Sequence, residues 1–197
     1  MEIRLFEGQD VESVTDLLHD MSRHYNADDV STRSAVRANL VERILGPNSG
    51  VTLVIALAGA RTVGLATISI LYPAPKERGQ LFMKELYVHS DCRGDRIGKQ
   101  LMVWIAKYAV QHDCVRLDWT AEATNPGAVR FYSALGARRV EEKIYFRFDG
   151  DDLLSFSEHG AQRSLARCRP QPAARELQIP GSPPSRKHRD RLATRRG

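Results

Sequence analysis

The chain has 197 residues, including 29 Lys and Arg, 24 Asp and Glu, and 42% hydrophobic residues, which is enough for one domain with a sizeable core. Its net charge of +5 comes from the C-terminal segment, where ten basic and two acidic residues follow Ala161; residues 1–160 carry 19 basic and 22 acidic residues. This balance disfavours a nucleic-acid groove in the folded part. The absence of a long apolar run disfavours a membrane protein.

The cysteine content and the N-terminal sequence indicate a cytoplasmic protein. Cys92, Cys114 and Cys168 form neither a Cys-x-x-Cys pair nor a metal-ligand spacing. Such sparse, odd-numbered cysteines are typical of a reducing compartment, and the first residues lack the pattern of a signal peptide. We therefore expect a cytoplasmic location and no metal site.

Hydrophobic periodicity predicts the elements of the first half of the chain. Asp10 is a suitable N-cap for the first helix, whose apolar positions continue to Met21. Pro73 and Pro75 are expected to interrupt the strands. The predicted elements, in chain order, are a strand near residues 3–5, a helix over 10–21, a helix over 32–45, and strands over 51–57, 62–71 and 80–88.

The second half of the folded part is predicted to begin with a helix over residues 97–110, whose apolar side chains share one face. A buried strand over residues 115–120 follows. Asn125 and Pro126 are a typical N-cap and first residue of the next helix, and Gly136 is a typical residue just after its C-terminus. Alternation over Arg139–Phe148 predicts a last strand.

The C-terminal segment has a different composition. From Ser157 onward it is rich in Arg, Pro, Ser and Ala and poor in large apolar residues. Such a segment buries too little surface to offset the entropy of ordering. We therefore predict a folded domain over residues 1–150 and a basic, largely disordered tail over residues 151–197.

The loop before the helix at residue 97 is a candidate anion-binding site. It reads Arg93, Gly94, Asp95, Arg96, Ile97, Gly98. The N-terminus of a helix presents free N–H groups and a partial positive charge, and glycines let a ligand approach the backbone closely. Glycines before a helix are also common turn residues, so this loop alone leaves both interpretations open. It lacks the Gly-Lys-Ser/Thr ending of a P-loop and the repeated βαβ setting of a dinucleotide site.

Two motifs resemble those of the GNAT acetyltransferases. The apolar strand 82–88 and the following loop are similar to the family's motif A, in which Arg/Gln-x-x-Gly-x-Gly/Ala follows a strand. The second motif, Asn-x-x-Ala-x-x-Phe-Tyr-x-x-x-Gly, is matched by Asn125, Ala128, Phe131, Tyr132 and Gly136. The resemblance covers about residues 1–150 and is nearest to the diamine or polyamine acetyltransferase-like branch. It implies an α/β fold with a mixed, mostly antiparallel sheet that is splayed at its centre and has helices on both faces.

The resemblance also implies a site for acetyl-CoA between the strand that ends at Val88 and the strand 115–120. The strand backbone would pair with the pantetheine and polarise the thioester carbonyl, and the loop N–H groups would hold the pyrophosphate. Position 96 departs from the pattern, because Arg96 stands where the family usually has Gly. The implied cofactor-binding residues are Leu86, Tyr87, Val88, Arg93, Gly94, Asp95, Arg96, Ile97, Gly98, Lys99, Asn125 and Ala128.

Two residues have implied catalytic roles. Tyr132 matches the family's general acid, which protonates the departing thiolate; the alternative is a core aromatic residue. Glu85 would act as general base on the acceptor ammonium, directly or through water; the alternative is a structural or solvent-facing carboxylate. Lys84 departs from the acidic character of the polyamine enzymes, and its charge disfavours a polycationic substrate.

The sequence therefore predicts an N-acetyltransferase that transfers an acetyl group directly from acetyl-CoA to an amine of a small molecule or peptide. Three alternatives remain at this stage. A catalytically silent relative would bind CoA as a sensor or interaction module. A protein N-terminal or lysine acetyltransferase would differ at the acceptor. A nucleic-acid-binding protein would act through its tail. We expect no membrane partner, consider nucleic acid unfavoured, and regard a homodimer as an open possibility.

Overall fold

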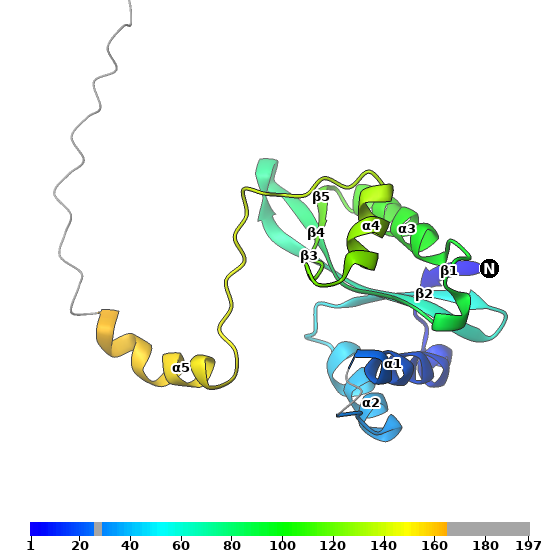
Figure 1. The fold of residues 1–197 in the computed structure, drawn as a ribbon, viewed down its shortest axis with the longest axis horizontal. Helices are drawn as coiled ribbons and strands as arrows, with labels where there is room; N and C mark the ends of the chain where they lie inside the picture. Colours follow the sequence, from blue (N-terminus) through cyan, green and yellow to red (C-terminus); the bar gives the residue numbers. More distant parts are fainter. Residues whose placement is uncertain (26–28, 165–197) are drawn as a thin grey trace, which may run out of the picture. The chain divides into compact units, whose positions relative to one another are not determined.

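The computed structural model describes residues 1–25 and 29–164 of the chain. One sheet organises residues 1–139, with the strand order β1-β2-β3-β4-β5 (Figure 1). Neighbouring strands are antiparallel except for β4 and β5, which are parallel. The strands are β1 (Glu2–Leu5), β2 (Thr52–Ala58), β3 (Arg61–Ala74), β4 (Arg78–Val88) and β5 (Cys114–Trp119).

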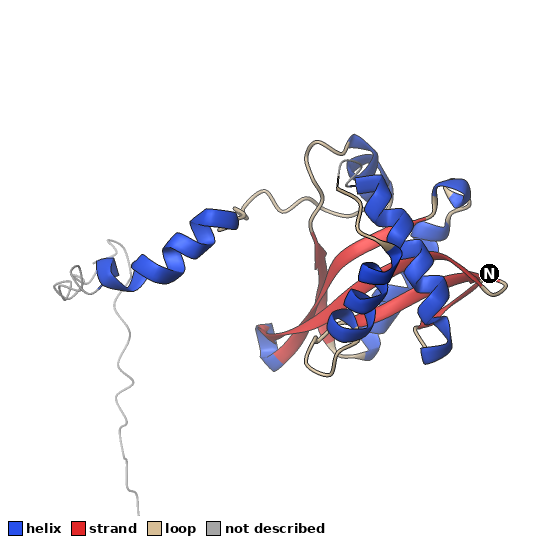
Figure 2. Cartoon of the chain, turned by 90° about the horizontal axis from the view of Figure 1, so that it is seen from below, coloured by secondary structure: helices blue, strands red, loops and turns tan. Residues whose placement is uncertain are grey.

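Helices cover both faces of this sheet (Figure 2). The α-helices are α1 (Val11–Tyr25), α2 (Arg33–Asn39), α3 (Ile97–Gln111), α4 (Pro126–Ala134) and α5 (Gly150–Ser164). Shorter helical segments are η1 (Gly8–Asp10), η2 (Leu40–Ile44), η3 (Pro75–Glu77) and η4 (Ser90–Cys92). The mixed, mostly antiparallel sheet with helices on both faces confirms the predicted fold class.

The sheet separates two hydrophobic clusters. On one face, α3 supplies the buried Leu101 and Ile105, which pack with Leu81 and Met83 of β4. On the other face, Tyr87 of β4 belongs to the cluster formed with α1 and α2. In a regular strand, Leu81, Met83 and Tyr87 would share one face. The β3–β4 pairing has a bulge where Met83 pairs with Ile68 and Glu85 with Thr67, and this extra residue of β4 reverses the alternation, so β4 contributes to both clusters. The end of β4 therefore lies between the two layers of helices.

Local sequence signals fix the ends of α4 as predicted. The Asn125 side chain accepts a hydrogen bond from the Ala128 N–H at 3.0 Å, and Pro126 is the first helical residue. Gly136 has φ 82°, and its N–H donates to the Ser133 carbonyl. The Ala137 N–H donates to the Tyr132 carbonyl, which completes a Schellman motif.

Three boundaries differ from the prediction. Strand β3 continues through Pro73 to Ala74 instead of ending at Leu71. The pairing of β3 with β4 shifts register between Leu71 and Ala74, and at such an irregularity the missing N–H of a proline is tolerated. Helix α1 extends beyond Met21 to Tyr25, with basic residues in its last turn that suit the negative end of the helix dipole. The predicted helix over 32–45 begins at its N-cap Thr32 and changes at Leu40 from α-helix to one π-helical stretch.

The predicted last strand over Arg139–Phe148 is wrong for the structure of the single chain. Residues 137–149 form no helix or strand, and Ile144 and Phe146 are 77% and 84% exposed. Alternation specifies two faces of a strand, but a strand also needs a ladder of backbone hydrogen bonds with a neighbouring strand, and no such ladder runs along this segment in the described structure. The structure divides into the compact units Met1–Arg139 and Val140–Gly197, and α5 lies in the second.

The expected disorder of the C-terminal tail is therefore not supported over residues 151–164, which are helical. Residues 165–197 lie outside the described residues. No helix in the described parts of the chain has the length and apolar character needed to cross a membrane. The domain boundary near residue 150 stays a prediction.

Candidate active site

Strand β4 is paired with β5 only along its first half. Their parallel pairing ends where Met83 lies opposite Trp119, whereas the antiparallel pairing of β4 with β3 continues to Val88 opposite Gly64. On the side away from β3, the backbone of residues 84–88 therefore has no strand partner in the described structure. This is the splay that the sequence resemblance implied, and it leaves backbone N–H and C=O groups available to an extended ligand.

Helix α3 begins close to the end of β4. A Cβ placed on Gly98 would lie 3.2 Å from the Phe131 ring of α4 and 3.9 Å from Val88 of β4. The starts of α3 and α4 and the end of β4 thus meet at one point. A side chain at position 98 would crowd the Phe131 ring at this close approach, a packing role that the motif alone did not reveal.

The loop before α3 has backbone groups suited to an anion. Gly94 has φ 99° and Arg96 has φ 63°, so both adopt conformations that glycine adopts most easily. The Gln100 N–H donates to the Arg96 carbonyl at 3.0 Å, so the N–H groups of Ile97, Gly98 and Lys99 precede the first intrahelical bond. Asp95 and Lys99 are exposed.

The exposed side chain of Arg93 folds back over the end of β4. Its Nε donates to the Val88 carbonyl at 3.2 Å, and its guanidinium lies 5.6 Å from the centre of the Tyr87 ring. Its own N–H donates to the Ser90 carbonyl at 3.1 Å. In this structure Arg93 connects the loop to the end of β4, and the free N–H groups belong to the residues after it.

Tyr132 lies on α4 beside the splay. Its ring is partly buried and packs against Trp119 at the end of β5, with ring centres 5.1 Å apart. Burial first, and then the charges of the nearby Tyr25 and Glu85, raise the pKa of Tyr132 to about 12. The phenol is therefore protonated at neutral pH. It has the protonation state that a general acid requires.

Glu85 is on β4 opposite Thr67 of β3, within the segment that has left β5. Its side chain is 39% exposed and is paired with the Lys84 ammonium at 3.2 Å. The carboxylate is accessible, and its charge acts on Tyr132. The structure thus brings Glu85 and Tyr132 together, although they are 47 positions apart in the sequence.

The other predicted site residues divide between backbone and structural roles. Leu86 and Val88 pack partly buried against the α3 side of the sheet. The Tyr87 side chain faces the opposite side and donates to Asp20 at 2.8 Å, so only its backbone is available at the splay. Asn125 and Ala128 bond to each other as the cap of α4.

Residues at the end of α1 were missed as site neighbours. Tyr25 lies edge-on to Tyr87, with ring centres 6.2 Å apart, and the His24 Nε2 is 3.4 Å from the Arg93 guanidinium. The sequence prediction ended the helix at Met21, before either residue. No Gly or Pro occurs between Met21 and Tyr25. This absence of a helix stop signal could have predicted that the helix continues through His24 and Tyr25.

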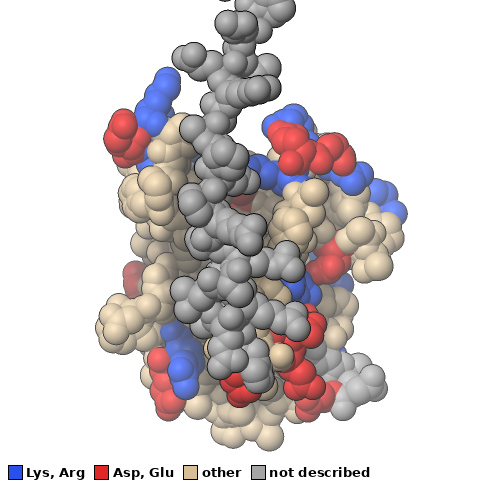
Figure 3. Space-filling view, turned by 90° about the vertical axis from the view of Figure 1, so that its left-hand side faces the viewer, with Lys and Arg blue, Asp and Glu red and all other residues tan. Residues whose placement is uncertain are grey.

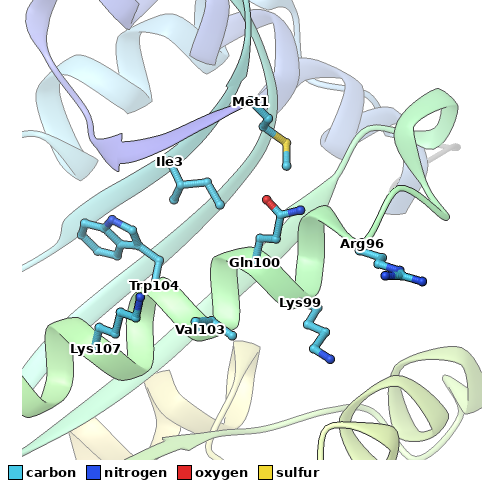
Figure 4. A pocket seen from close by; sticks show the side chains of 8 residues that line it. All are labelled: Met1, Ile3, Arg96, Lys99, Gln100, Val103, Trp104 and Lys107. Atoms are coloured by element: carbon cyan, nitrogen blue, oxygen red, sulfur yellow. The ribbon is translucent and has the colours of Figure 1, made fainter.

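A shallow hollow of about 450 Å³ lies on the exposed side of α3, between it and β1 (Figure 4). Arg96, Lys99 and Lys107 line it together with Trp104. It is separate from the splay, but Arg96 and Lys99 also belong to the loop and first turn of α3. Positive charge is therefore concentrated around the start of this helix.

Elsewhere, charge is mixed. Acidic and basic side chains lie next to one another on the face shown in Figure 3. No group of three or more His, Cys, Asp and Glu side chains suited to a metal ion occurs in residues 1–25 and 29–164.

These features define an α/β protein with a splayed sheet, a helix start with free N–H groups and a tyrosine beside the splay. Residues 14–137 match the model of the acetyltransferase (GNAT) family. The chain belongs to this family.

Similarity to individual proteins supports the assignment. The chain is 28% identical over 87 residues to L-ornithine N5-acetyltransferase NATA1 of Arabidopsis thaliana and 29% identical over 98 residues to thialysine N-epsilon-acetyltransferase of Bos taurus. These matches cover 44% and 48% of this chain, and only 38% and 57% of the two relatives. They agree with the predicted resemblance to the polyamine acetyltransferase-like branch.

Solved structures show the same fold. An integron cassette protein, VCH_CASS6, from the mobile metagenome of V. cholerae is 37% identical, with a TM-score of 0.77 over 80% of this chain and 97% of that protein. The aminoglycoside N-acetyltransferase AAC(6')-Iy, solved in complex with CoA, is 18% identical, with a TM-score of 0.60 over 76% of this chain and 95% of that one. The second likeness concerns the fold alone.

Proposed function

We propose that the protein is an N-acetyltransferase that transfers an acetyl group directly from acetyl-CoA to a primary amine of a small molecule or peptide. The observation that carries this proposal is the position of Tyr132 and Glu85. Both lie where β4 leaves β5, next to the start of α3. A proton donor and a proton acceptor thus border the same backbone segment that is free to bind a ligand.

The residues around the splay fit acetyl-CoA, which would supply the acetyl group as an activated thioester. Residues Leu86, Tyr87 and Val88 would pair with its extended arm through their backbone. The backbone N–H groups of the loop, that of Arg96 included, and of the first turn of α3 would hold its pyrophosphate, with the Lys99 ammonium nearby. Asn125 and Ala128 contribute by fixing the start of α4. A nucleotide with an acyl-carrying arm is the ligand that this combination of a strand edge and a helix N-terminus favours.

The proposed chemistry is acid–base. Glu85 would accept a proton from the acceptor ammonium, directly or through water, because a carboxylate can accept a proton whereas the protonated phenol of Tyr132 can donate one. Tyr132 would donate its hydroxyl proton to the departing sulfur and then recover a proton from solvent. The free backbone of β4 would orient the reacting carbonyl and polarise it.

The acceptor proposed first is a small amine that also carries a carboxylate. Both curated relatives are named for amino acids that bear a side-chain amine. Lys84 points to the same class, because its ammonium neutralises part of the Glu85 charge and repels further cations. Spermidine and spermine are therefore expected to be poor acceptors. The free thiols of Cys92 and Cys114 support a reducing, cytoplasmic setting.

The test is calorimetry with CoA followed by a turnover assay against ornithine, thialysine, lysine, spermidine and short peptides. We expect CoA affinity in the micromolar range, about −8 kcal/mol, and acetylation of at least one amine. CoA binding without turnover on any acceptor would favour the silent sensor. Turnover confined to peptides would favour a protein acetyltransferase. Absence of CoA binding would refute the proposal.

A further inference from the structure

The face of β4 that carries Glu85 also carries an accessible aromatic ring. Glu85 pairs with Thr67 of β3, and Phe82 pairs with Ser69. Since Thr67 and Ser69 are two residues apart, Glu85 and Phe82 share one face of the sheet and lie about 7 Å apart along it. Phe82 is partly exposed, and among the described residues it belongs to neither hydrophobic cluster. The ring is therefore available to the apolar part of a ligand whose amine lies at Glu85.

An ion pair of β5 lies on the same face. Asp118 is the parallel partner of Phe82, and Arg116 comes two residues before it, so both side chains share the face of Phe82. The Arg116 Nε is 3.0 Å from the Asp118 carboxylate and donates to the Gln80 side-chain oxygen at 3.0 Å. The Arg116 and Asp118 side chains are 46% and 39% exposed. An exposed ion pair contributes little to folding stability, and both of its groups stay accessible to a ligand.

We infer that Arg116 and Asp118 bind the α-carboxylate and the α-ammonium of an amino acid whose side-chain amine lies at Glu85. This inference rests on the proposed function and names the residues that would select the acceptor. The acceptor carboxylate would pair with the guanidinium, and the acceptor α-ammonium would pair with the Asp118 carboxylate, so that the four charges alternate in sign. The Phe82 ring would pack against the methylene groups between the two ends of the acceptor.

The spacing of these groups fits an acceptor of defined length. Asp118 is one strand away from Phe82, about 4.8 Å, so its position in the sheet is about 8 Å from that of Glu85. In extended ornithine or lysine, the side-chain nitrogen lies about 5–6 Å from the α-carbon. The acceptor therefore spans most of this distance, and a hydrogen bond at each end spans the rest.

The charges on this face favour a zwitterion over a polyamine. Arg116 and Asp118 together are neutral, and the Lys84 ammonium is 3.2 Å from the Glu85 carboxylate. Each carboxylate is thus already next to a cation, so the second ammonium of a polyamine gains little there. An amino acid brings its own carboxylate for Arg116, and a diamine does not.

The first test is steady-state acetylation by the wild type of ornithine and lysine and of analogues that lack one part of the head group. The α-amine is missing from 5-aminopentanoate and 6-aminohexanoate, and the carboxylate is missing from putrescine and cadaverine. We expect kcat/KM to be at least about tenfold lower for each analogue than for its parent amino acid, because one charge-assisted pair is lost.

Two variants assign the two halves of the head group. Arg116→Gln should raise KM at least about tenfold for the amino acids and the aminoalkanoates, but not for the diamines. Asp118→Asn should raise KM for the amino acids and the diamines, but not for the aminoalkanoates. In both variants kcat should stay close to the wild-type value, because neither side chain contacts the amine that reacts.

Arg78→Gln is the matched control. Arg78 begins β4, is 38% exposed and is paired with Asp113 at 2.6 Å, so it resembles Arg116 in everything except position. This variant should keep every wild-type KM, and all three variants should melt and bind CoA like the wild type. If a variant fails to fold, the wild-type comparison of acceptors decides alone.

Two results would overturn the inference and leave the proposed function standing. One is turnover of diamines or peptides without a preference for free amino acids. The other is a set of KM values that neither Arg116→Gln nor Asp118→Asn changes. Absence of turnover with every amine would overturn the proposed function and this inference together.

Discussion

Replacing Tyr132 with Phe removes one hydroxyl group and keeps the ring that packs against Trp119. In the structure, the pKa of this hydroxyl is raised from 10.0 to about 12, first by burial. That difference corresponds to about 3 kcal/mol against the phenolate. Tyr132 therefore stays protonated over the whole range in which an assay can be run. If it is the acid, its loss is expected to lower turnover by about 10²–10⁴, the usual contribution of a positioned acid.

The assay is steady-state turnover with the best acceptor, measured between about pH 6 and pH 10. The raised pKa has a consequence for the shape of the wild-type profile. Because the acid form is the active one and persists to about pH 12, Tyr132 should cause no alkaline decline below pH 10. Any rise of activity with pH would then reflect deprotonation of the acceptor amine.

The control is Tyr108→Phe. Tyr108 is also a partly buried tyrosine, but it stacks with Trp104 on α3, away from the splay. Both variants should fold and bind CoA like the wild type, and only Tyr132→Phe should lose turnover. Wild-type turnover in Tyr132→Phe, with normal melting and CoA binding, would refute the acid role while leaving the fold and the ligand site unaffected.

Three other substitutions test the surrounding structure. Arg96→Gly should keep CoA affinity. It should raise the unfolding free energy by up to about 1 kcal/mol, because relief of about 1–2 kcal/mol of left-handed strain exceeds the entropy cost of glycine. A tenfold loss of affinity in calorimetry would show that the Arg96 side chain contacts phosphate. Gly98→Ala should lower the unfolding free energy by about 1–3 kcal/mol, because the new methyl group meets Phe131, and an unchanged denaturation midpoint would contradict this packing. Asp10→Ala should cost about 1–2 kcal/mol at pH 7, because the Asp10 carboxylate accepts from the Glu7 N–H of η1 and from Arg4. Arg4 lowers the Asp10 pKa, so this contribution is present above the ordinary value of 3.8 and is lost as pH falls through the lower, folded-state value; a difference between wild type and variant in urea unfolding that did not shrink in acid would contradict it.

The parts of the fold that depend on local chemistry could be predicted from the sequence. Asn125, Pro126 and Gly136 each satisfy a backbone requirement of α4 through their own side chain or φ angle, so their positions fixed the helix in advance. The same is true of the apolar face of α3. The family motifs then supplied the order of the elements.

The parts that depend on pairing between distant segments could not be predicted. Arg139–Phe148 alternates like a strand, but its pattern contains no information on which edge it joins or in which molecule. The proximity of Tyr25 to Tyr132 likewise depends on how far α1 continues and on how it crosses the sheet. The roles of Tyr132 and Glu85 rest on motif resemblance and position, and they stay predictions until tested.

The two hydrophobic clusters, one on each face of the sheet, have a consequence for how this protein can change over time. Side chains of the α3 cluster and of the α1 and α2 cluster are separated by the backbone of the sheet. Substitutions in separate clusters without shared partners are expected to add in free energy with little coupling. Mutations in α1 and α2 can therefore accumulate while the face built on α3 and α4, where the free helix N–H groups lie, keeps its packing. Under the proposed function, the α1 and α2 face could diverge in small steps without variants that lose the site of the acetyl donor.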